Sequence, residues 1–313
     1  MSDITVACVQ AGSIYLDPSA TTDKILKLIE KASEKGAKLI VFPELILSGY
    51  PNFNVGSIEY RRRYNDSAVL ADGPELTQIS EAAGEHGAVV VLGFNERDPD
   101  YPEVVYDSSC VIDASGEPVG THRKISPFGA EKIIFKAGDA RDIRLFETEV
   151  GKLGIGLCFE NLNPLYRRAL SLLGEEIHCS LWVTSQDTRH VVEGSSVVTA
   201  VEGGVYVAAA SQVTSGTANF ERGLSFIGGS CVLDPWGNYV AEPVFKSERT
   251  LYAKIRPGSW NVRKFQSRGI EARDDLLSLN IATERYSPLN RVPFEDSDPS
   301  NGSTDETSKK SPR

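Results

Sequence analysis

Apolar residues along the chain follow two spacings, and their alternation predicts strands alternating with helices. Runs in which most residues are apolar predict buried strands at residues 4–10 and 38–42. Between them, apolar residues recur every three or four positions from Ile25 to Ala32, which predicts a helix over residues 20–35. A second unit repeats this plan.

The second unit has a predicted helix at residues 74–86 and a strand at residues 88–93, after which the pattern changes. Strands at residues 104–112 and 118–125 are separated by a short turn sequence, which predicts a hairpin. Strands at residues 143–147 and 152–158, with a turn near Val150 and Gly151, predict another such pair. The same criteria predict further strands at residues 181–184, 205–211, 228–233, 239–243 and 250–255, and helices at residues 166–173 and 191–203. Two βαβ halves with antiparallel hairpins predict an α/β fold: a four-layer α-β-β-α sandwich with two facing mixed sheets.

The domain organisation predicted from the sequence is simple. No repeat of about 20–50 residues is visible, which argues against a solenoid. Residues 1–290 contain no linker-like stretch and are expected to form one domain. The last residues, 291–313, are rich in Ser, Asp, Pro, Lys and Thr, and we expect a disordered polar tail there.

Composition and charge narrow the range of partners. The net charge of −10 disfavours nucleic acid and anionic membrane surfaces, and the basic cluster 61–63 is short enough to be a solvated helix face. No apolar run approaches the roughly 20 residues that span a bilayer. The five cysteines form no Cys-x-x-Cys pair and no apolar signal segment opens the chain, so we expect reduced thiols in the cytoplasm. The four histidines form no ligand-like pair, so neither a metal site nor a cofactor is expected.

Three residues at the ends of predicted strands can supply one active site. Glu44 could accept a proton and later activate water, Lys124 could stabilise developing negative charge, and Cys158 could be the nucleophile. Cys158 falls between a strand and a helix, where a sharp bend exposes a side chain. Each residue alone has a simpler reading, as a core cysteine, a surface glutamate or a solvated lysine. Together they predict a cysteine hydrolase.

The segments around these residues resemble the motifs of the nitrilase superfamily of carbon–nitrogen hydrolases. The motifs are Val-Phe-Pro-Glu-Leu-Ile-Leu-Ser-Gly-Tyr-Pro at residues 41–51, Thr-His-Arg-Lys-Ile-Ser-Pro at 121–127 and Gly-Leu-Cys-Phe-Glu-Asn at 156–161. The resemblance covers roughly residues 4–285, and segments 228–237 and 272–279 are similar to the nitrilase branch. It implies that Glu131 is a second glutamate that positions the lysine and the substrate. It also implies a homo-oligomer, a dimer or a larger assembly such as a spiral, formed through residues 164–173 and the C-terminal segment.

The activity implied by this resemblance is hydrolysis of a nitrile to a carboxylic acid and ammonia through a cysteine thioester. The Gly-Tyr-Pro sequence at residues 49–51 is typical of nitrilases, whereas Phe159 stands where nitrilases usually carry tryptophan. The alternative is an amidase of the same fold: an ω-amidase, a carbamoylase or a small aliphatic amidase. A third alternative is a catalytically silent scaffold. Candidate substrate contacts, for whose aromatic members a core role is equally plausible, are Tyr50, Phe53, Phe128, Phe159, Glu160 and Trp182.

Overall fold

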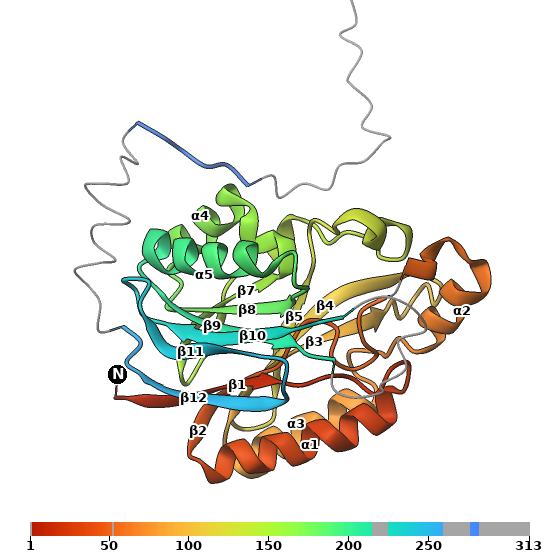
Figure 1. The fold of residues 1–313 in the computed structure, drawn as a ribbon, viewed down its shortest axis with the longest axis horizontal. Helices are drawn as coiled ribbons and strands as arrows, with labels where there is room; N and C mark the ends of the chain where they lie inside the picture. The colour runs from red at the N-terminus through yellow and green to blue at the C-terminus, as the bar shows by residue number, and fades with distance from the viewer. Residues whose placement is uncertain (1, 52, 215–224, 259–275, 282–313) are drawn as a thin grey trace, which may run out of the picture.

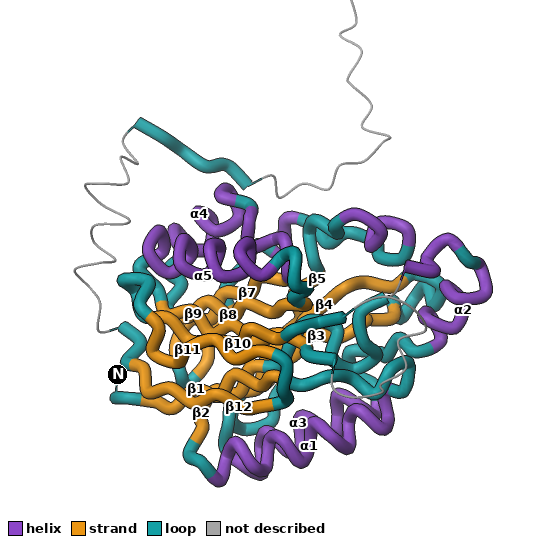
Figure 2. Tube along the Cα trace, in the orientation of Figure 1, coloured by secondary structure: helices purple, strands orange, loops and turns teal. Residues whose placement is uncertain are grey.

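Two six-stranded sheets face each other, and helices cover their outer faces (Figure 1). The structure is a computed structural model that describes residues 2–51, 53–214, 225–258 and 276–281. Colouring by secondary structure shows α1 and α3 beyond one sheet and α4 and α5 beyond the other (Figure 2). The predicted four-layer α-β-β-α sandwich is therefore confirmed.

The first sheet has the strand order β12-β1-β2-β3-β4-β5. Its strands are β1 (Ile4–Gln10), β2 (Ala37–Val41), β3 (Val89–Arg97), β4 (Val105–Ile112), β5 (Pro118–Arg123) and β12 (Arg249–Ile255). The strands β1, β2 and β3 are parallel, and the remaining pairs are antiparallel. The three parallel strands thus lie next to one another, so the ends of β1 and β2 fall at the same edge of the sheet.

The second sheet repeats this plan with the order β11-β10-β9-β8-β7-β6. Its strands are β6 (Phe146–Thr148), β7 (Gly151–Leu157), β8 (Ile177–Val183), β9 (Tyr206–Gln212), β10 (Gly228–Leu233) and β11 (Tyr239–Phe245). Again three strands, β7 to β9, are parallel. The first half of the molecule comprises β1 to β6 and the second half β7 to β12. Each half contributes an edge strand to the other's sheet, because β6 pairs with β7 and β12 pairs with β1.

The helices are amphipathic, and all except α2 bury one face against a sheet. They are α1 (Pro18–Glu34), α2 (Ile58–Asp66), α3 (Pro74–His86), α4 (Pro164–Leu173) and α5 (Arg189–Gly203), with the 3-10 turns η1 (Phe53–Gly56), η2 (Gly129–Ile133), η3 (Ala140–Asp142) and η4 (Cys158–Leu162). The side chain of Asp17 caps α1 by accepting a hydrogen bond from the Ala20 amide, and Pro18 begins the helix. Ile25 and Ile29 of α1 then pack against the first sheet.

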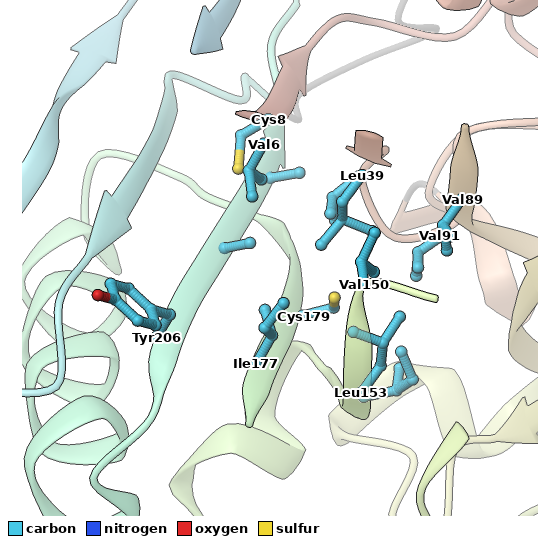
Figure 3. Close-up of a cluster of buried hydrophobic side chains, with 14 of the residues drawn as sticks. Val6, Cys8, Leu39, Val89, Val91, Val150, Leu153, Ile177, Cys179 and Tyr206 are labelled. Carbon is cyan, nitrogen blue, oxygen red and sulfur yellow. The ribbon is translucent and has the colours of Figure 1, made fainter. Parts of the chain in front are cut away.

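The main core lies between the two sheets (Figure 3). In β1, Val6 and Cys8 face this inter-sheet core, whereas Ala7 and Val9 face the helix layer. This is the two-residue period of a strand, and both faces are apolar because both are covered. The central parallel strands are therefore nearly continuous apolar runs, which is the pattern that made them predictable.

The structure differs from the predicted elements in a few places. Helix α2 was not predicted, because its sequence is mostly polar and it buries only Tyr60 and Tyr64, which are one helical turn apart. Strand β8 begins at Ile177, four residues before the predicted start, because His178 and Ser180 interrupt its apolar run although both are buried. The predicted polar tail at residues 291–313 and the first half of the nitrilase-like segment 272–279 lie outside the described residues.

Among the described residues, no helix is both long enough and apolar enough to cross a lipid bilayer.

Candidate active site

Lys124 lies at the centre of a buried cluster of carboxylates. It follows β5, and its backbone amide donates to the Asp107 carbonyl of the neighbouring strand β4. Its Nζ lies 2.6 Å from Glu44 Oε1, 2.9 Å from Asp107 Oδ2 and 2.8 Å from Glu131 Oε2. The lysine side chain is fully buried. The three carboxylates raise the pKa of Lys124 well above its usual value against the opposing effect of burial, so the amine stays charged.

Glu44 reaches the cluster because the chain turns tightly after β2. A Cβ at Gly93 would lie 2.6 Å from the Glu44 Cα, so only glycine allows β3 to pass this turn. The Glu44 carbonyl accepts a hydrogen bond of 2.7 Å from the Gln212 side chain, which ties the glutamate to the other half of the molecule. Burial raises the pKa of the Glu44 carboxyl well above its usual value, and Lys124 opposes this shift.

Glu131 lies in η2 and is held by several hydrogen bonds. Its Oε2 accepts from the Phe128 amide at 2.7 Å, and its Oε1 accepts from the Tyr50 hydroxyl at 2.6 Å. With the Lys124 ammonium, both of its oxygens are occupied. This carboxylate is therefore well solvated by the protein despite being buried, as a charged group must be.

Cys158 follows the last residue of β7 and begins η4. Its φ is +49°, in the left-handed region that costs a residue with a Cβ about 1–2 kcal/mol. The Asn161 side chain clamps this bend by donating to the Cys158 carbonyl at 2.8 Å and the Gly156 carbonyl at 3.1 Å. The residue is 3 % exposed. The bend is thus a strained elbow that is stabilised from one side by an amide.

A buried chain of polar groups supports Asn161 in turn. His178 Nε2 lies 2.7 Å from Asn161 Oδ1, and His178 Nδ1 lies 2.7 Å from Glu175 Oε1. A Cβ at Gly154 would lie 1.7 Å from the same Glu175 oxygen, so the glycine leaves room for this chain. The Gly-Ile-Gly sequence before the cysteine therefore makes space for the groups that hold the elbow.

The charges of the carboxylate cluster and of Lys124 act on the thiol of Cys158. Burial raises the pKa of the Cys158 thiol well above its usual value, the Glu44 charge raises it further, and the Lys124 charge lowers it. Glu131 and Asp107 act on the same thiol. The structure thus brings together the four residues expected from the sequence, and it keeps the resting thiol protonated, so that a thiolate requires a proton acceptor.

Glu160, a substrate contact expected from the sequence, is buried and bonded within the protein. Its Oε1 accepts from the Ile125 amide at 2.6 Å, and its Oε2 accepts from the Leu157 amide at 2.9 Å and lies 3.0 Å from His122 Nε2. Both oxygens are engaged with the protein. Glu160 thus ties the residue after Lys124 to the residue before Cys158, and it bridges the two strand ends.

The aromatic candidates form a layered wall behind the cysteine. Phe128 is half-exposed and stacks on Phe159, with ring centroids 4.1 Å apart. Phe159 meets the fully buried Trp182 edge to face, and the indole N–H of Trp182 donates to Ser180 within the core. Trp182 thus has the core role that was its alternative reading. The side chain of Phe53 lies outside the described residues.

Asp107 is the site residue that sequence reasoning missed. It lies in the middle of β4, every residue of which is buried, and its side chain is fully buried beside Lys124. The signal that could have revealed it is a carboxylate inside an otherwise strand-like run, because an aspartate is almost never fully buried without a partner.

Three carboxylates this close could also hold a cation. Oxygens of Glu44, Asp107 and Glu131 lie within 4.8 Å of one another. The Lys124 ammonium, however, is 2.6–2.9 Å from all three and occupies the place between them. In the described part of the chain, Lys124 thus supplies the positive charge between the three carboxylates.

Comparisons with known proteins agree with this architecture. The family model for carbon–nitrogen hydrolases matches residues 5–264. A bifunctional nitrilase/nitrile hydratase, NIT4B of Nicotiana tabacum, is 32 % identical over 312 residues, which cover 91 % of this chain and 88 % of the tobacco protein. Nitrilase 2 of Arabidopsis thaliana is 32 % identical over 314 residues, which cover 91 % of each chain.

Solved structures share the fold. Saccharomyces cerevisiae Nit3, a member of branch 10 of the nitrilase superfamily, superposes with a TM-score of 0.71 at 24 % identity, covering 89 % of this chain and 95 % of Nit3. XC1258 of Xanthomonas campestris has a TM-score of 0.72 at 20 % identity, covering 90 % of this chain and all of XC1258. Together with the family match, these likenesses define an enzyme that hydrolyses carbon–nitrogen bonds. The chain belongs to the carbon–nitrogen hydrolase family, within the nitrilase superfamily, and the relatives named above are nitrilases.

Proposed function

We propose that this enzyme hydrolyses an organic nitrile to a carboxylic acid and ammonia, with Cys158 as nucleophile, Glu44 as general base and Lys124 as electrostatic stabiliser. The observation that carries the proposal is the buried Lys124 ammonium, held by Glu44, Asp107 and Glu131 and acting on the thiol of the strained Cys158 elbow. Glu131 positions Lys124 and the substrate.

The reaction begins with proton transfer from Cys158 Sγ to Glu44 as sulfur attacks the nitrile carbon. The C≡N π electrons move to nitrogen, which takes up the proton from Glu44 and gives a thioimidate. Water then adds with Glu44 as base, ammonia leaves, and a thioester remains. A second water, activated by Glu44, releases the acid and restores the thiol. The raised pKa of Glu44 supports this role, because a stronger base is better matched to a thiol whose pKa is also raised.

Two groups can stabilise the negative charge that develops during these steps. The Lys124 ammonium is preorganised by three carboxylates and needs no reorganisation when charge appears. The backbone N–H of Phe159, next to the nucleophile in η4, is the second donor. The Phe128–Phe159 stack and the Tyr50 ring, whose hydroxyl is bound to Glu131, would line the substrate side of the site.

The relatives support nitriles, whereas one structural neighbour keeps an amidase as the second candidate. The tobacco and Arabidopsis relatives are named as nitrilases. The amidase from Nesterenkonia sp. AN1, with a TM-score of 0.66 and 22 % identity, was solved with acrylamide added to its active-site cysteine. Phe159, in place of the tryptophan usual in nitrilases, is the feature of this chain that favours the amidase.

A matched panel of nitriles and their amides, read by ammonia release, tests the proposal. We expect the nitriles to be turned over, and mass spectrometry of the quenched enzyme to find an acyl adduct on Cys158. Cys158→Ala should lower the rate by at least three powers of ten, whereas Cys231→Ala, a buried free cysteine of the same cluster, should keep most of it. Turnover of amides only would replace the nitrilase by the amidase. Turnover of neither set would leave the catalytically silent scaffold.

We further propose that the enzyme is a homo-oligomer that works in the cytoplasm. The outer side of α4 and α5 exposes apolar side chains, which supports a contact between copies there: Leu165, Leu172, Leu173 and Val198. Five free cysteines, one of them the proposed nucleophile, support a reducing compartment. Sedimentation of the purified protein tests the first point: a dimer or larger species is expected, and a monomer at micromolar concentration would contradict it.

A further inference from the structure

Two oxygens in the carboxylate cluster have no ordinary hydrogen-bond partner. Glu44 Oε2 and Asp107 Oδ1 are both buried, and among the described residues no N–H or O–H group donates to either. The other oxygen of each carboxyl receives the Lys124 ammonium, at 2.6 Å from Glu44 Oε1 and 2.9 Å from Asp107 Oδ2. A buried carboxylate oxygen with nothing donating to it is costly, because it has lost its hydrogen bonds to water without a replacement.

The two carboxyls are close enough to satisfy each other. Both bind the same nitrogen atom, and oxygens of Glu44, Asp107 and Glu131 lie within 4.8 Å of one another. If one of the pair carried a proton, that proton would provide the missing donor. Glu131 differs, because Tyr50, Phe128 and Lys124 already supply donors to it.

We propose that Glu44 and Asp107 share one proton between their two unpartnered oxygens, and that Asp107, by carrying this proton, keeps Glu44 available as the ionised base. Asp107 acts through Glu44 and Lys124 and is a positioning residue. The inference rests on the proposed role of Glu44. A dyad of this kind titrates as one unit rather than as two separate carboxyls.

The charges around the pair favour the shared proton. With three ionised carboxylates the cluster would hold three negative charges against one positive charge, and sharing a proton reduces this excess. Burial raises the pKa of Asp107 to about 6, and burial together with Asp107 and Glu131 raises that of Glu44. The titratable and charged groups that face the pair are Lys124, Glu131, Cys158, Tyr50 and Tyr64.

The shared proton fits the proposed reaction without an additional proton source. In the reactive form the proton lies on Asp107, which donates to Glu44. The Cys158 proton then moves to Glu44 as the S–C bond forms, and Glu44 passes it to the substrate nitrogen. The proton on Asp107 stays in place throughout, so the same hydrogen bond is ready for the water-activating steps.

Counting the protons released on unfolding tests the pair without any substrate. At pH 6 the folded pair holds one proton, whereas the same carboxyls in the unfolded chain are almost fully ionised. Denaturation of Cys158→Ala protein in weakly buffered solution should therefore release about one proton more than denaturation of Cys158→Ala/Asp107→Asn protein. The matched control Asp98→Asn changes a buried carboxylate that accepts from the Tyr106 hydroxyl and loop amides, and it should leave the count unchanged.

Infrared spectroscopy provides a second measurement that does not depend on the Asp107 variant folding. The folded Cys158→Ala protein should show a protonated-carboxyl band that persists at pH 6, above the range in which ordinary carboxyls ionise. Absence of that band, or an equal proton count with and without Asp107, would overturn the shared proton.

Activity then separates proton sharing from simple packing. Asn at position 107 can donate an N–H to Glu44 as protonated Asp107 would, whereas Leu cannot, so Asp107→Asn should be at least tenfold more active than Asp107→Leu. Equal loss in both would contradict the role. If neither nitriles nor amides are turned over but the proton count holds, the proposed function fails and the dyad stands.

Discussion

The two halves of the molecule share one strand plan but have different chemistry at corresponding positions. Each sheet has three parallel strands, flanked by one antiparallel strand on one side and by two on the other. In the first half, the first of the three parallel strands, β1, ends at Gln10. The Gln10 side chain accepts hydrogen bonds from the amides of Gly229 and Ser230 and donates one to the Ser247 carbonyl, so it connects the two halves. The counterpart of β1 is β7, which leads into Cys158.

The halves also differ in the unfavourable feature that each must stabilise. The first half buries three ionisable groups, Glu44, Asp107 and Lys124, and their charges must be balanced inside the protein. The second half holds a backbone bend at positive φ, and it must surround that bend with hydrogen bonds from Asn161 and its neighbours. The arrangement of the strands determines which residues come into contact, whereas the residue types at the strand ends determine the chemistry of each contact.

The largest effect is expected when the positive charge of Lys124 is removed from the first half. Lys124→Met leaves three carboxylates facing one another without a cation, so we expect a loss of about 3–5 kcal/mol in the free energy of unfolding and a fall in activity of at least three powers of ten. Urea unfolding and ammonia release measure the two effects. Lys27→Met, on the exposed side of α1, is the matched control. A loss of stability no larger than that of the control would contradict the account of the cluster.

A smaller effect is expected from removing the clamp in the second half. Asn161→Ala removes the donors to the carbonyls of Gly156 and Cys158 and leaves His178 without a partner on one nitrogen, so about 1–3 kcal/mol of stability should be lost. The rate should fall about a hundredfold because the elbow is no longer held. Asn238→Ala, in an exposed turn, serves as control. Unchanged kcat in Asn161→Ala would show that the strained bend needs no clamp.

The contact between the halves gives a pH-dependent prediction. Glu160 raises the pKa of His122 above its usual value of about 6.5, although burial opposes this. The folded state therefore binds this proton more tightly than the unfolded state. The resulting stability is fully present below about pH 6.5 and is lost as the pH rises through the raised value. Denaturant midpoints across this range measure it, and His122→Asn should flatten the curve; a slope that persists in the variant would assign it to other groups.

The smallest effect is expected at the aromatic wall. Phe128 is half-exposed, so Phe128→Ala should reduce stability by only about 1 kcal/mol, the scale of one aromatic pair. Because the ring covers Phe159 beside the nucleophile, KM should change several-fold while kcat changes little. Tyr101→Ala, an exposed aromatic residue outside the site, is the comparison. A change confined to kcat would argue against a role in substrate binding.

Much of this site was accessible from the sequence because Glu44, Lys124 and Cys158 all follow predicted strands within recognisable motifs. Asp107 was not, because it lies inside a strand, and a period-two pattern does not distinguish a buried charge from an ordinary strand residue. The hydrogen bonds of Glu160 could not be predicted for a related reason, because two of the groups that its carboxylate contacts, the Ile125 amide and His122, lie 35 and 38 residues away in the sequence.

By itself the sequence determined the order of most strands and helices and the candidate nucleophile, base and lysine, because these depend on local periodicity and on short motifs. Only the tertiary structure decided that β12 pairs with β1, that Glu160 and Trp182 support the site from behind, and that Asp107 completes the cluster around Lys124. These features depend on which distant strands pair and which buried charges must neutralise each other, and no local pattern in the chain encodes that.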